Sequence, residues 1–209
     1  MSSISRKKSL EIGKFIAKTE PKFGEVVAKF GPCPIGVVPS RVSNFTSLAE
    51  SILGQQLSIK AADTIINRVK VLSGGSLTPA KVAKLNHRSL RSAGCSENKA
   101  KALKALAESA NNGEVQLRSL SSKSDSEIME LLLPLFGVGK WTVEMFLIFQ
   151  LGRLDIWPVG DLGVRRGWEK LFRMPEEIEI TALIEAGEKF APYRSHLAWY
   201  CWRAHSLYS

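Results

Sequence analysis

Two segments of this chain, about twenty residues apart, contain residues that could act on a nucleic acid. The first, Gly137-Val138-Gly139-Lys140, places two glycines ahead of a long apolar stretch. Glycine permits a positive φ and a close approach of another backbone, and the amides at the start of a helix attract anions. We therefore predict a hairpin over Leu135–Lys140, continuing to Thr142, that grips a phosphate of the DNA backbone. The alternative is a helix–turn–helix connection in which the glycines serve geometry alone.

The second segment, Pro158-Val159-Gly160-Asp161, places one carboxylate where another helix is expected to begin. An aspartate there can simply be the N-cap of that helix. It is also kept ionised by the helix N-terminus, and an ionised carboxylate can stabilise the oxocarbenium-like charge that develops as a glycosidic bond breaks. We expect Asp161 to be the catalytic residue. Asp155 is a competitor, but no Pro/Gly turn precedes it.

Composition and charge narrow the class of protein. The 209 residues are 44% hydrophobic, which supports a sizeable core in one domain or two small lobes. The net charge of +9 favours a polyanionic partner, with nucleic acid ahead of an anionic membrane. We find no signal peptide and no apolar run that could span a membrane. Arg6-Lys7-Lys8 is expected to be a solvated basic tail.

The cysteines and histidines do not form a metal site. Neither residue type has ligand spacing, so no zinc site or iron–sulfur cluster is predicted from side chains. The cysteines are expected to be reduced, buried thiols, and the histidines to be ordinary surface or core residues; these residues are Cys33, Cys95, Cys201, His87, His196 and His205.

The periodicity of apolar residues is helical almost throughout, which predicts an all-α fold in two lobes. Helices are expected over 45–54, from Ser58 onward, from Ser96 to Asn112, and from Ser124 onward, where a capping box marks the start. Four more are expected over 141–151, 162–172, 176–190 and 193–206. The stretch 141–151 is apolar on nearly all sides, so we expect it to be buried.

Together these residues resemble the helix-hairpin-helix (HhH-GPD) DNA glycosylase superfamily, and in particular its 3-methyladenine DNA glycosylase II type. The resemblance runs from about residue 45 to 205, in a chain expected to be a single glycosylase domain over 1–209 without the N-terminal β domain of larger relatives. Its landmarks are Ile52–Ser58, the hairpin with Trp141-Thr142, Trp157–Asp161, and Pro192–Ser195 leading to Trp199–Arg203.

The resemblance implies a DNA-binding cleft between the two lobes, with the damaged nucleotide flipped into it. Asp161 matches the catalytic aspartate. Gln55, Gln56, Leu57 and Ser58 match the segment that fills the gap left by the flipped base. Gln56 is the first choice as the wedge and Leu57 the second, and the alternative is an ordinary turn between two helices. Family members often hold a monovalent cation, Na⁺ or K⁺, on hairpin carbonyls, which here belong to Phe136 and Val138. No cofactor is expected to be required.

Position 141 predicts the subclass. Superfamily members that also cleave the strand carry a lysine there, which attacks the sugar; this chain has Trp141, so we expect a monofunctional enzyme. The Trp141 ring would suit a cationic methylated purine, by stacking and cation–π attraction. Tyr193 and Trp199 are further candidates for the base pocket, with ordinary core packing as the alternative.

The resemblance therefore predicts a monofunctional glycosylase that removes 3-methyladenine and 7-methylguanine from double-stranded DNA and leaves an abasic site. The expected protein is a monomer, in bacterial cytoplasm at the nucleoid or in a eukaryotic nucleus. Two alternatives remain open: a bifunctional glycosylase/lyase, and a non-catalytic protein that only binds DNA lesions.

Overall fold

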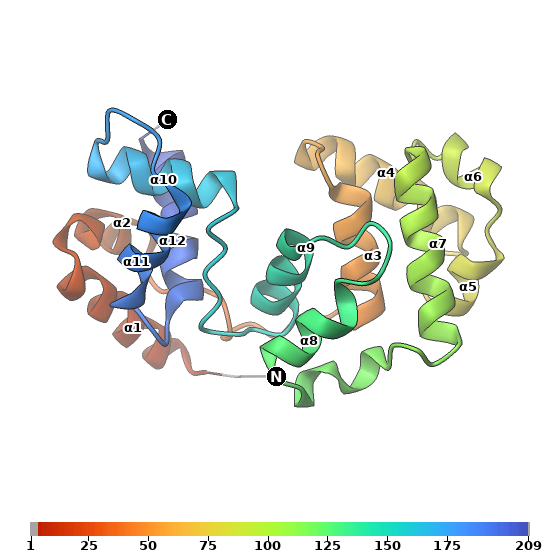
Figure 1. The fold of residues 1–209 in the computed structure, drawn as a ribbon, viewed down its shortest axis with the longest axis horizontal. Coiled ribbons are helices and arrows are strands. Elements are labelled where there is room, and N and C mark those ends of the chain that lie inside the picture. The colour runs from red at the N-terminus through yellow and green to blue at the C-terminus, as the bar shows by residue number, and fades with distance from the viewer. Residues whose placement is uncertain (1–3, 209) are drawn as a thin grey trace. The chain divides into compact units, whose positions relative to one another are not determined.

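The computed structural model describes residues 4–208, and within this range it contains helices and no strand (Figure 1). The prediction of an all-α fold is confirmed. The α-helices are α1 (Arg6–Thr19), α2 (Gly24–Phe30), α3 (Asn44–Gly54), α4 (Ile59–Leu72), α5 (Pro79–Lys84), α6 (His87–Ser92), α7 (Glu97–Asn111), α8 (Asp125–Leu132), α9 (Lys140–Met145), α10 (Leu162–Phe172), α11 (Ile180–Glu188) and α12 (Arg194–Leu207). Short 3₁₀ segments η1 (Pro21–Phe23) and η2 (Leu117–Ser122) and a π-helix η3 (Phe146–Gln150) complete the list.

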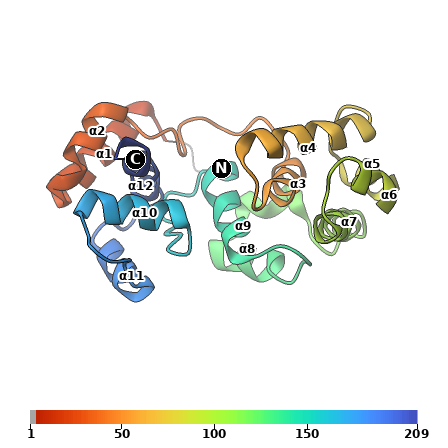
Figure 2. The same cartoon turned by 90° about the horizontal axis from the view of Figure 1, so that it is seen from above.

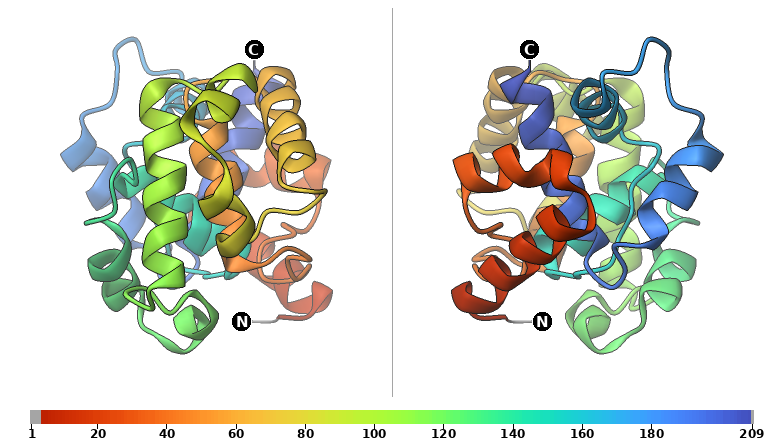
Figure 3. Two further views of the ribbon diagram at one scale, coloured as in Figure 1. Left: turned by 90° about the vertical axis from the view of Figure 1, so that its right-hand side faces the viewer. Right: turned by 90° about the vertical axis from the view of Figure 1, so that its left-hand side faces the viewer.

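The chain divides into two compact units. The first combines the described residues up to Pro39 with those from Leu147 onward, and the second is Ser40–Phe146. In the first unit, α12 packs against α10 and lies beside α1 and α2 (Figure 3). Its core includes an aromatic cluster in which Trp168 stacks on Phe172 at 4.5 Å and lies 5.9 Å from Phe23. This cluster fixes the C-terminal half of α10.

In the second unit, α3 packs against α4, α7 and α9 (Figure 2). Its inner face is fully buried at Leu48, Ile52 and Leu53. Two lysines of α7 cap the C-terminal ends of neighbouring helices. Lys99 donates a hydrogen bond to the carbonyl of Leu53, and Lys104 donates one to the carbonyl of Leu85. These bonds satisfy C-terminal carbonyls of α3 and the cap of α5, which would otherwise lack a partner.

The predicted helix starts follow from local capping. The hydroxyls of Ser58 and Ser96 accept hydrogen bonds from the third residue of α4 and α7. Ser124 and Glu127 form the full capping box at the start of α8. The predicted bounds of α10, 162–172, match the structure. These predictions succeeded because each depends on groups within four residues of one another.

Three predictions about elements were wrong. Arg6-Lys7-Lys8 is not a tail, because the Ser5 hydroxyl caps α1 at this point and all three residues are helical. The expected helix over 141–151 is α9 followed by the π-helix η3, and it is not buried all round: Trp141 and Phe149 are 41% and 52% exposed. A π-helix adds a residue to the turn and so turns side chains out of register.

The helix expected over 176–190 is shorter, because α11 begins only at Ile180. The preceding residues are bound by α10 instead: the Glu169 carboxylate accepts a 3.0 Å bond from the amide of Ile178, and Arg166 pairs with Glu177. These contacts hold the segment before α11 against side chains of α10. Helix α1 and the short helices α2, α5 and α6 had no clear signal in the sequence.

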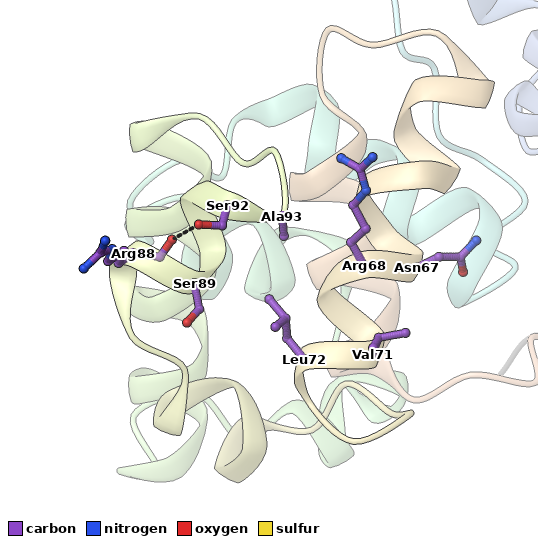
Figure 4. A pocket seen from close by; sticks show the side chains of 8 residues that line it. All are labelled: Asn67, Arg68, Val71, Leu72, Arg88, Ser89, Ser92 and Ala93. Carbon is purple, nitrogen blue, oxygen red and sulfur yellow. Dashed lines mark hydrogen bonds between the residues drawn. The ribbon is translucent and has the colours of Figure 1, made fainter.

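A hollow of about 590 Å³ lies on the second unit between α4 and α6 (Figure 4). Leu72 of α4 points toward Ala93, just after α6, while the guanidinium group of Arg88 points away. This hollow is lined by none of the residues singled out for DNA chemistry. No helix of the described residues is long and apolar enough to cross a membrane.

Candidate active site

Asp161 is the N-cap of α10, as its sequence context predicted. It follows a turn closed by a bond from its own amide to the Pro158 carbonyl, 2.9 Å. Its Oδ1 accepts two hydrogen bonds, one from the Val164 amide at 2.9 Å and one from the indole nitrogen of Trp202 at 2.8 Å. The side chain is half-buried. Two donors from different helices therefore hold the carboxylate in one orientation.

Two glycines of α10 make this arrangement sterically possible. A Cβ on Gly163 would lie 2.8 Å from Cδ1 of Trp202 and 3.1 Å from Oδ1 of Asp161. A Cβ on Gly167, one turn later, would overlap the backbone carbonyl of Cys201. The G-x-x-x-G pattern thus lets the backbones of α10 and α12 approach closely. As a result, the indole of Trp202 on α12 reaches Asp161, the N-cap of α10.

The segment that leads to Asp161 is fastened to the start of α12. The Ser195 amide donates to the Leu154 carbonyl, and the Ser195 hydroxyl accepts from the Ile156 amide, both at 2.9 Å. Trp157 donates from its indole to the Leu183 carbonyl of α11 at 2.8 Å. The landmark residues at 157 and 195 therefore act together to set where the turn at Asp161 begins.

Asp155, the competing carboxylate, is engaged elsewhere. Its two oxygens accept from Nε and Nη2 of Arg194, each at 2.7 Å, and one of them also accepts from the Arg194 amide at 3.2 Å. This fork-to-fork pair is the strong form of an arginine–carboxylate interaction. The Asp155 carboxylate raises the pKa of Arg194 by accepting these hydrogen bonds. Asp155 thus has a structural partner on both oxygens.

The hairpin has the positive φ and the close backbone approach that its glycines suggested, but the close neighbour is helix α7. Gly137 has φ +77°, and a Cβ there would overlap that of Ala102 on α7. The turn is closed by a 3.0 Å bond from the Val138 amide to the Leu135 carbonyl. Gly139 begins α9 without a side-chain cap, and nothing lies within 4 Å of the position its Cβ would take. The close approach at Gly137 is therefore to α7, and the open side is at Gly139.

The other hairpin residues differ in exposure. Val138 and Thr142 are buried, at 5% and 2%. Lys140 is exposed, and its Nζ lies 3.8 Å from a carboxylate oxygen of the buried Glu144 one turn later. Among the described residues, no group of three or more acidic, histidine or cysteine side chains could hold a metal ion. The suggestion of a monovalent cation on the Phe136 and Val138 carbonyls stays a prediction.

The four residues named as the DNA wedge do not share one environment. The side-chain amide of Gln55 donates to the Gly137 carbonyl and to the Thr142 hydroxyl, both at 3.0 Å. Gln56 and Leu57 are exposed, and Gln56 has φ +56°. Ser58 is the N-cap of α4. Of the four, Gln56 and Leu57 are presented outward, while Gln55 is turned onto the hairpin.

The three residues expected in the base pocket have separate surroundings. Trp141 is exposed at the start of α9. The Tyr193 ring lies edge-on to Phe15 of α1 at 5.8 Å. Trp199 is 7% exposed, packs edge-on against Tyr200, and has the Arg203 guanidinium 4.8 Å above its ring. The Tyr193 and Trp199 rings thus pack against other side chains of the first unit.

The aromatic group beside Asp161 consists of two residues that sequence reasoning missed. Trp202 stacks on Phe149 with ring centroids 5.4 Å apart and an interplanar angle of 27°, and Phe149 is 52% exposed. The spacing of Gly163 and Gly167 could have indicated a close crossing of α10. Nothing in the sequence indicated which indole on α12 would meet the carboxylate. Next to Trp202, burial raises the pKa of the Cys201 thiol, and the nearby Asp161 charge raises it further, so this thiol stays protonated.

The chain is similar to known proteins of one superfamily. A family model described as "HhH-GPD superfamily base excision DNA repair protein" matches residues 49–191, which is more than half of the chain. The chain belongs to this superfamily. The expected family is therefore confirmed.

Individual relatives agree with this membership. DNA-3-methyladenine glycosylase 1 of Schizosaccharomyces pombe is 35% identical over 166 residues, covering 78% of this chain and 73% of that protein. The solved structure of an S. pombe 3-methyladenine DNA glycosylase in complex with abasic DNA is similar with a TM-score of 0.83 and 31% identity, over 92% of this chain and 95% of that one. A DNA-3-methyladenine glycosidase structure from Bacillus halodurans has a TM-score of 0.79 and 34% identity, over 92% and 88%.

Proposed function

We propose that this protein is a monofunctional DNA glycosylase that hydrolyses the N-glycosidic bond of alkylated purines in double-stranded DNA. The observation that carries the proposal is Asp161, held by Trp202 and Val164 at the start of α10 in a chain of the HhH-GPD superfamily. Similarity to proteins named as 3-methyladenine glycosylases supports the choice of substrate. The net charge of +9 supports a DNA partner.

Asp161 supplies the electrostatic part of the reaction. As the bond between C1′ and the base nitrogen breaks, its electron pair leaves with the base and positive charge develops on the sugar. A carboxylate fixed in place beforehand stabilises that charge without having to reorganise. Water then adds to C1′ and loses a proton, which leaves an abasic site. The two hydrogen bonds on Oδ1 keep the carboxylate in one orientation.

Alkylated purines suit this site because they need little help to leave. A purine methylated at N3 or N7 carries a positive charge, so it departs as a neutral base without an acid to protonate it. The exposed face of Phe149, stacked on Trp202 beside Asp161, offers an aromatic surface to such an electron-poor ring. Trp141 remains a second candidate for contact with the base.

The absence of a suitable lysine supports a monofunctional reaction. Position 141 is a tryptophan. The neighbouring Lys140 lies about 100° around the helix from it, and its Nζ is 3.8 Å from a carboxylate oxygen of Glu144. The hairpin Gly137–Lys140 and the exposed pair Gln56 and Leu57 are proposed to contact DNA, the former at the backbone and the latter as the wedge. The protein is proposed to act as a monomer.

The test is release of methylated purines from alkylated duplex DNA under single-turnover conditions. Wild type is compared with Asp161→Asn, which keeps the size and the N-cap oxygen but removes the charge. We expect release by wild type and a loss of at least about a hundredfold in Asp161→Asn, with DNA affinity retained. Asp155→Asn is the matched control, because it removes the competing carboxylate.

Three outcomes would contradict the proposal. Equal release by wild type and Asp161→Asn would mean that another residue is catalytic. Tight binding of lesion DNA with no release by wild type would favour a lesion-binding protein. A covalent enzyme–DNA adduct trapped by borohydride would mean that the enzyme also cleaves the strand through an amine, and would refute the argument from Trp141.

A further inference from the structure

Gln55 links two parts of the second unit that the sequence separates widely. Its Nε2 donates to the Gly137 carbonyl and to the Thr142 Oγ1, both at 3.0 Å, across 82 and 87 residues. An amide nitrogen carries two hydrogens, so both donors are used. Thr142 is only 2% exposed, so its hydroxyl is a fixed acceptor. The side chain of Gln55 is therefore committed to the hairpin.

The backbone at Gln55 determines where the next residues point. The Leu57 amide donates to the Gly54 carbonyl at 3.2 Å, which closes a four-residue turn with Gln55 and Gln56 at its centre. Gln56, the third residue of this turn, has φ +56°, where glycine is normally preferred. Such a conformation persists only when its surroundings hold it. Anchoring Gln55 to the hairpin is one such restraint.

The hairpin does not depend on this link for its own shape. The bond from the Val138 amide to the Leu135 carbonyl closes its turn, and Gly137 is packed against Ala102. The two hydrogen bonds from Gln55 therefore serve mainly to set the turn Gly54–Leu57 relative to the hairpin.

We propose that Gln55 is a positioning residue that locks the wedge turn to the backbone-gripping hairpin, so that gripping the DNA backbone places Gln56 and Leu57 at the gap in the stack. This inference rests on the proposed function. It assigns the insertion to Gln56 and Leu57 and removes Gln55 from the residues that enter the duplex. Without the link, the hairpin would still bind DNA, but the wedge would not be held at a fixed distance from it.

The experiment measures two affinities and one spectroscopic signal. Affinity is measured for a duplex that contains a tetrahydrofuran abasic analogue and for a matched undamaged duplex. A third duplex has 2-aminopurine beside the analogue. The fluorescence of 2-aminopurine rises when this base is unstacked from its neighbours. The variants are Gln55→Met, which keeps the length and loses both donors, Thr142→Val, which removes one acceptor, and their double mutant. Gln116→Met, at an exposed position of the same unit, is the control for the substitution itself.

We expect Gln55→Met to lose about tenfold of the preference for the abasic duplex, and most of the fluorescence rise, while the affinity for undamaged duplex stays the same. In Thr142→Val the preference for the abasic duplex should fall by about threefold, because the hydrogen bond from Gln55 to the Gly137 carbonyl remains. The double mutant should lose no more than Gln55→Met, since both changes act on one link. Gln116→Met should behave like wild type.

Each other result overturns a specific statement. A full abasic preference in Gln55→Met, with or without a lower melting temperature, would overturn the inference alone, because Gln55 would then serve only stability. Loss in Gln55→Met with none in Thr142→Val would mean that Gln55 itself enters the duplex, and would also overturn it. Wild type without any preference for the abasic duplex would overturn the proposed base-flipping function and the inference with it.

Discussion

The indole nitrogen of Trp202 donates a 2.8 Å hydrogen bond to Oδ1 of Asp161, across 41 residues of sequence. The same oxygen accepts the N-cap bond from Val164. A local capping interaction is thereby combined with a tertiary one on a single carboxylate oxygen. The stacked Phe149 ring fixes the Trp202 indole in turn. This chain of contacts holds the carboxylate of Asp161 in one orientation at the start of α10.

Removal of the indole donor should slow base release. Trp202→Phe keeps an aromatic ring for Phe149 but loses the hydrogen bond to a charged group, which is worth about 1.5–3 kcal/mol. We expect the single-turnover rate to fall by roughly tenfold to a hundredfold. Trp199→Phe, the same change one turn earlier at a ring that packs against Tyr200 and Arg203, is the matched control. Equal losses in both variants would mean that the effect is on packing.

Alanine at the two glycines of α10 should have different effects. At Gly167 the new Cβ would overlap the Cys201 carbonyl, which cannot move aside, so we expect a loss of about 3 kcal/mol in the free energy of unfolding. At Gly163 the new Cβ meets the Trp202 ring at 2.8 Å. That side chain can shift, so base release should fall more than stability does. Urea denaturation and single-turnover assays on both variants decide this, and the reverse pattern would contradict it.

The pair of Asp155 and Arg194 should matter for stability more than for chemistry. Asp155→Asn removes the charged partner of Arg194 on the segment that leads to Asp161. Loss of one member of a half-buried, bidentate pair should cost about 1–3 kcal/mol. Base release should persist in this variant when it is assayed well below its melting temperature. A loss of release as deep as that in Asp161→Asn, with little change in stability, would show that the two carboxylates have been assigned the wrong roles.

Stability should fall as the pH is lowered through the range in which histidine titrates. Burial lowers the pKa of His196 to about 4 from 6.5, so below pH 6.5 the unfolded chain binds a proton that the folded protein does not. The free energy of unfolding should therefore fall by about 2 kcal/mol between pH 7 and pH 5 on account of this residue. Urea denaturation at the two pH values measures it. His196→Leu should remove this part of the pH dependence, whereas His87→Gln, at a partly exposed histidine, should leave it in place.

Glycine in place of Gln56, in the turn Gly54–Leu57, should affect DNA binding without lowering stability. Gln56 has φ +56°, which costs a residue with a side chain about 1 kcal/mol compared with glycine. Gln56→Gly should therefore leave the free energy of unfolding unchanged or raise it slightly, and should weaken the preference for an abasic duplex. A variant with normal stability and full abasic preference would mean that the Gln56 side chain is not the wedge, leaving Leu57 as the candidate.

Local interactions made much of this protein predictable from its sequence. The serines at 58, 96 and 124 cap their helices, Gly137 takes a positive φ, and Asp161 caps α10, because each outcome depends on groups a few residues apart. The family landmarks rest on the same local features. The sequence alone therefore determined the all-α class, the hairpin and the position of the candidate catalytic carboxylate.

The tertiary structure decided which distant side chains meet these local features. Trp202 at Asp161, Arg194 at Asp155 and Gln55 at the hairpin are separated from their partners by 41, 39 and 82 residues. No periodicity or capping rule links such positions. They meet because helices cross where small residues allow it, as α10 and α12 do at Gly167, and a crossing is set by the packing of the whole unit. For that reason Trp199 was expected beside the base while Trp202 is the residue that contacts Asp161.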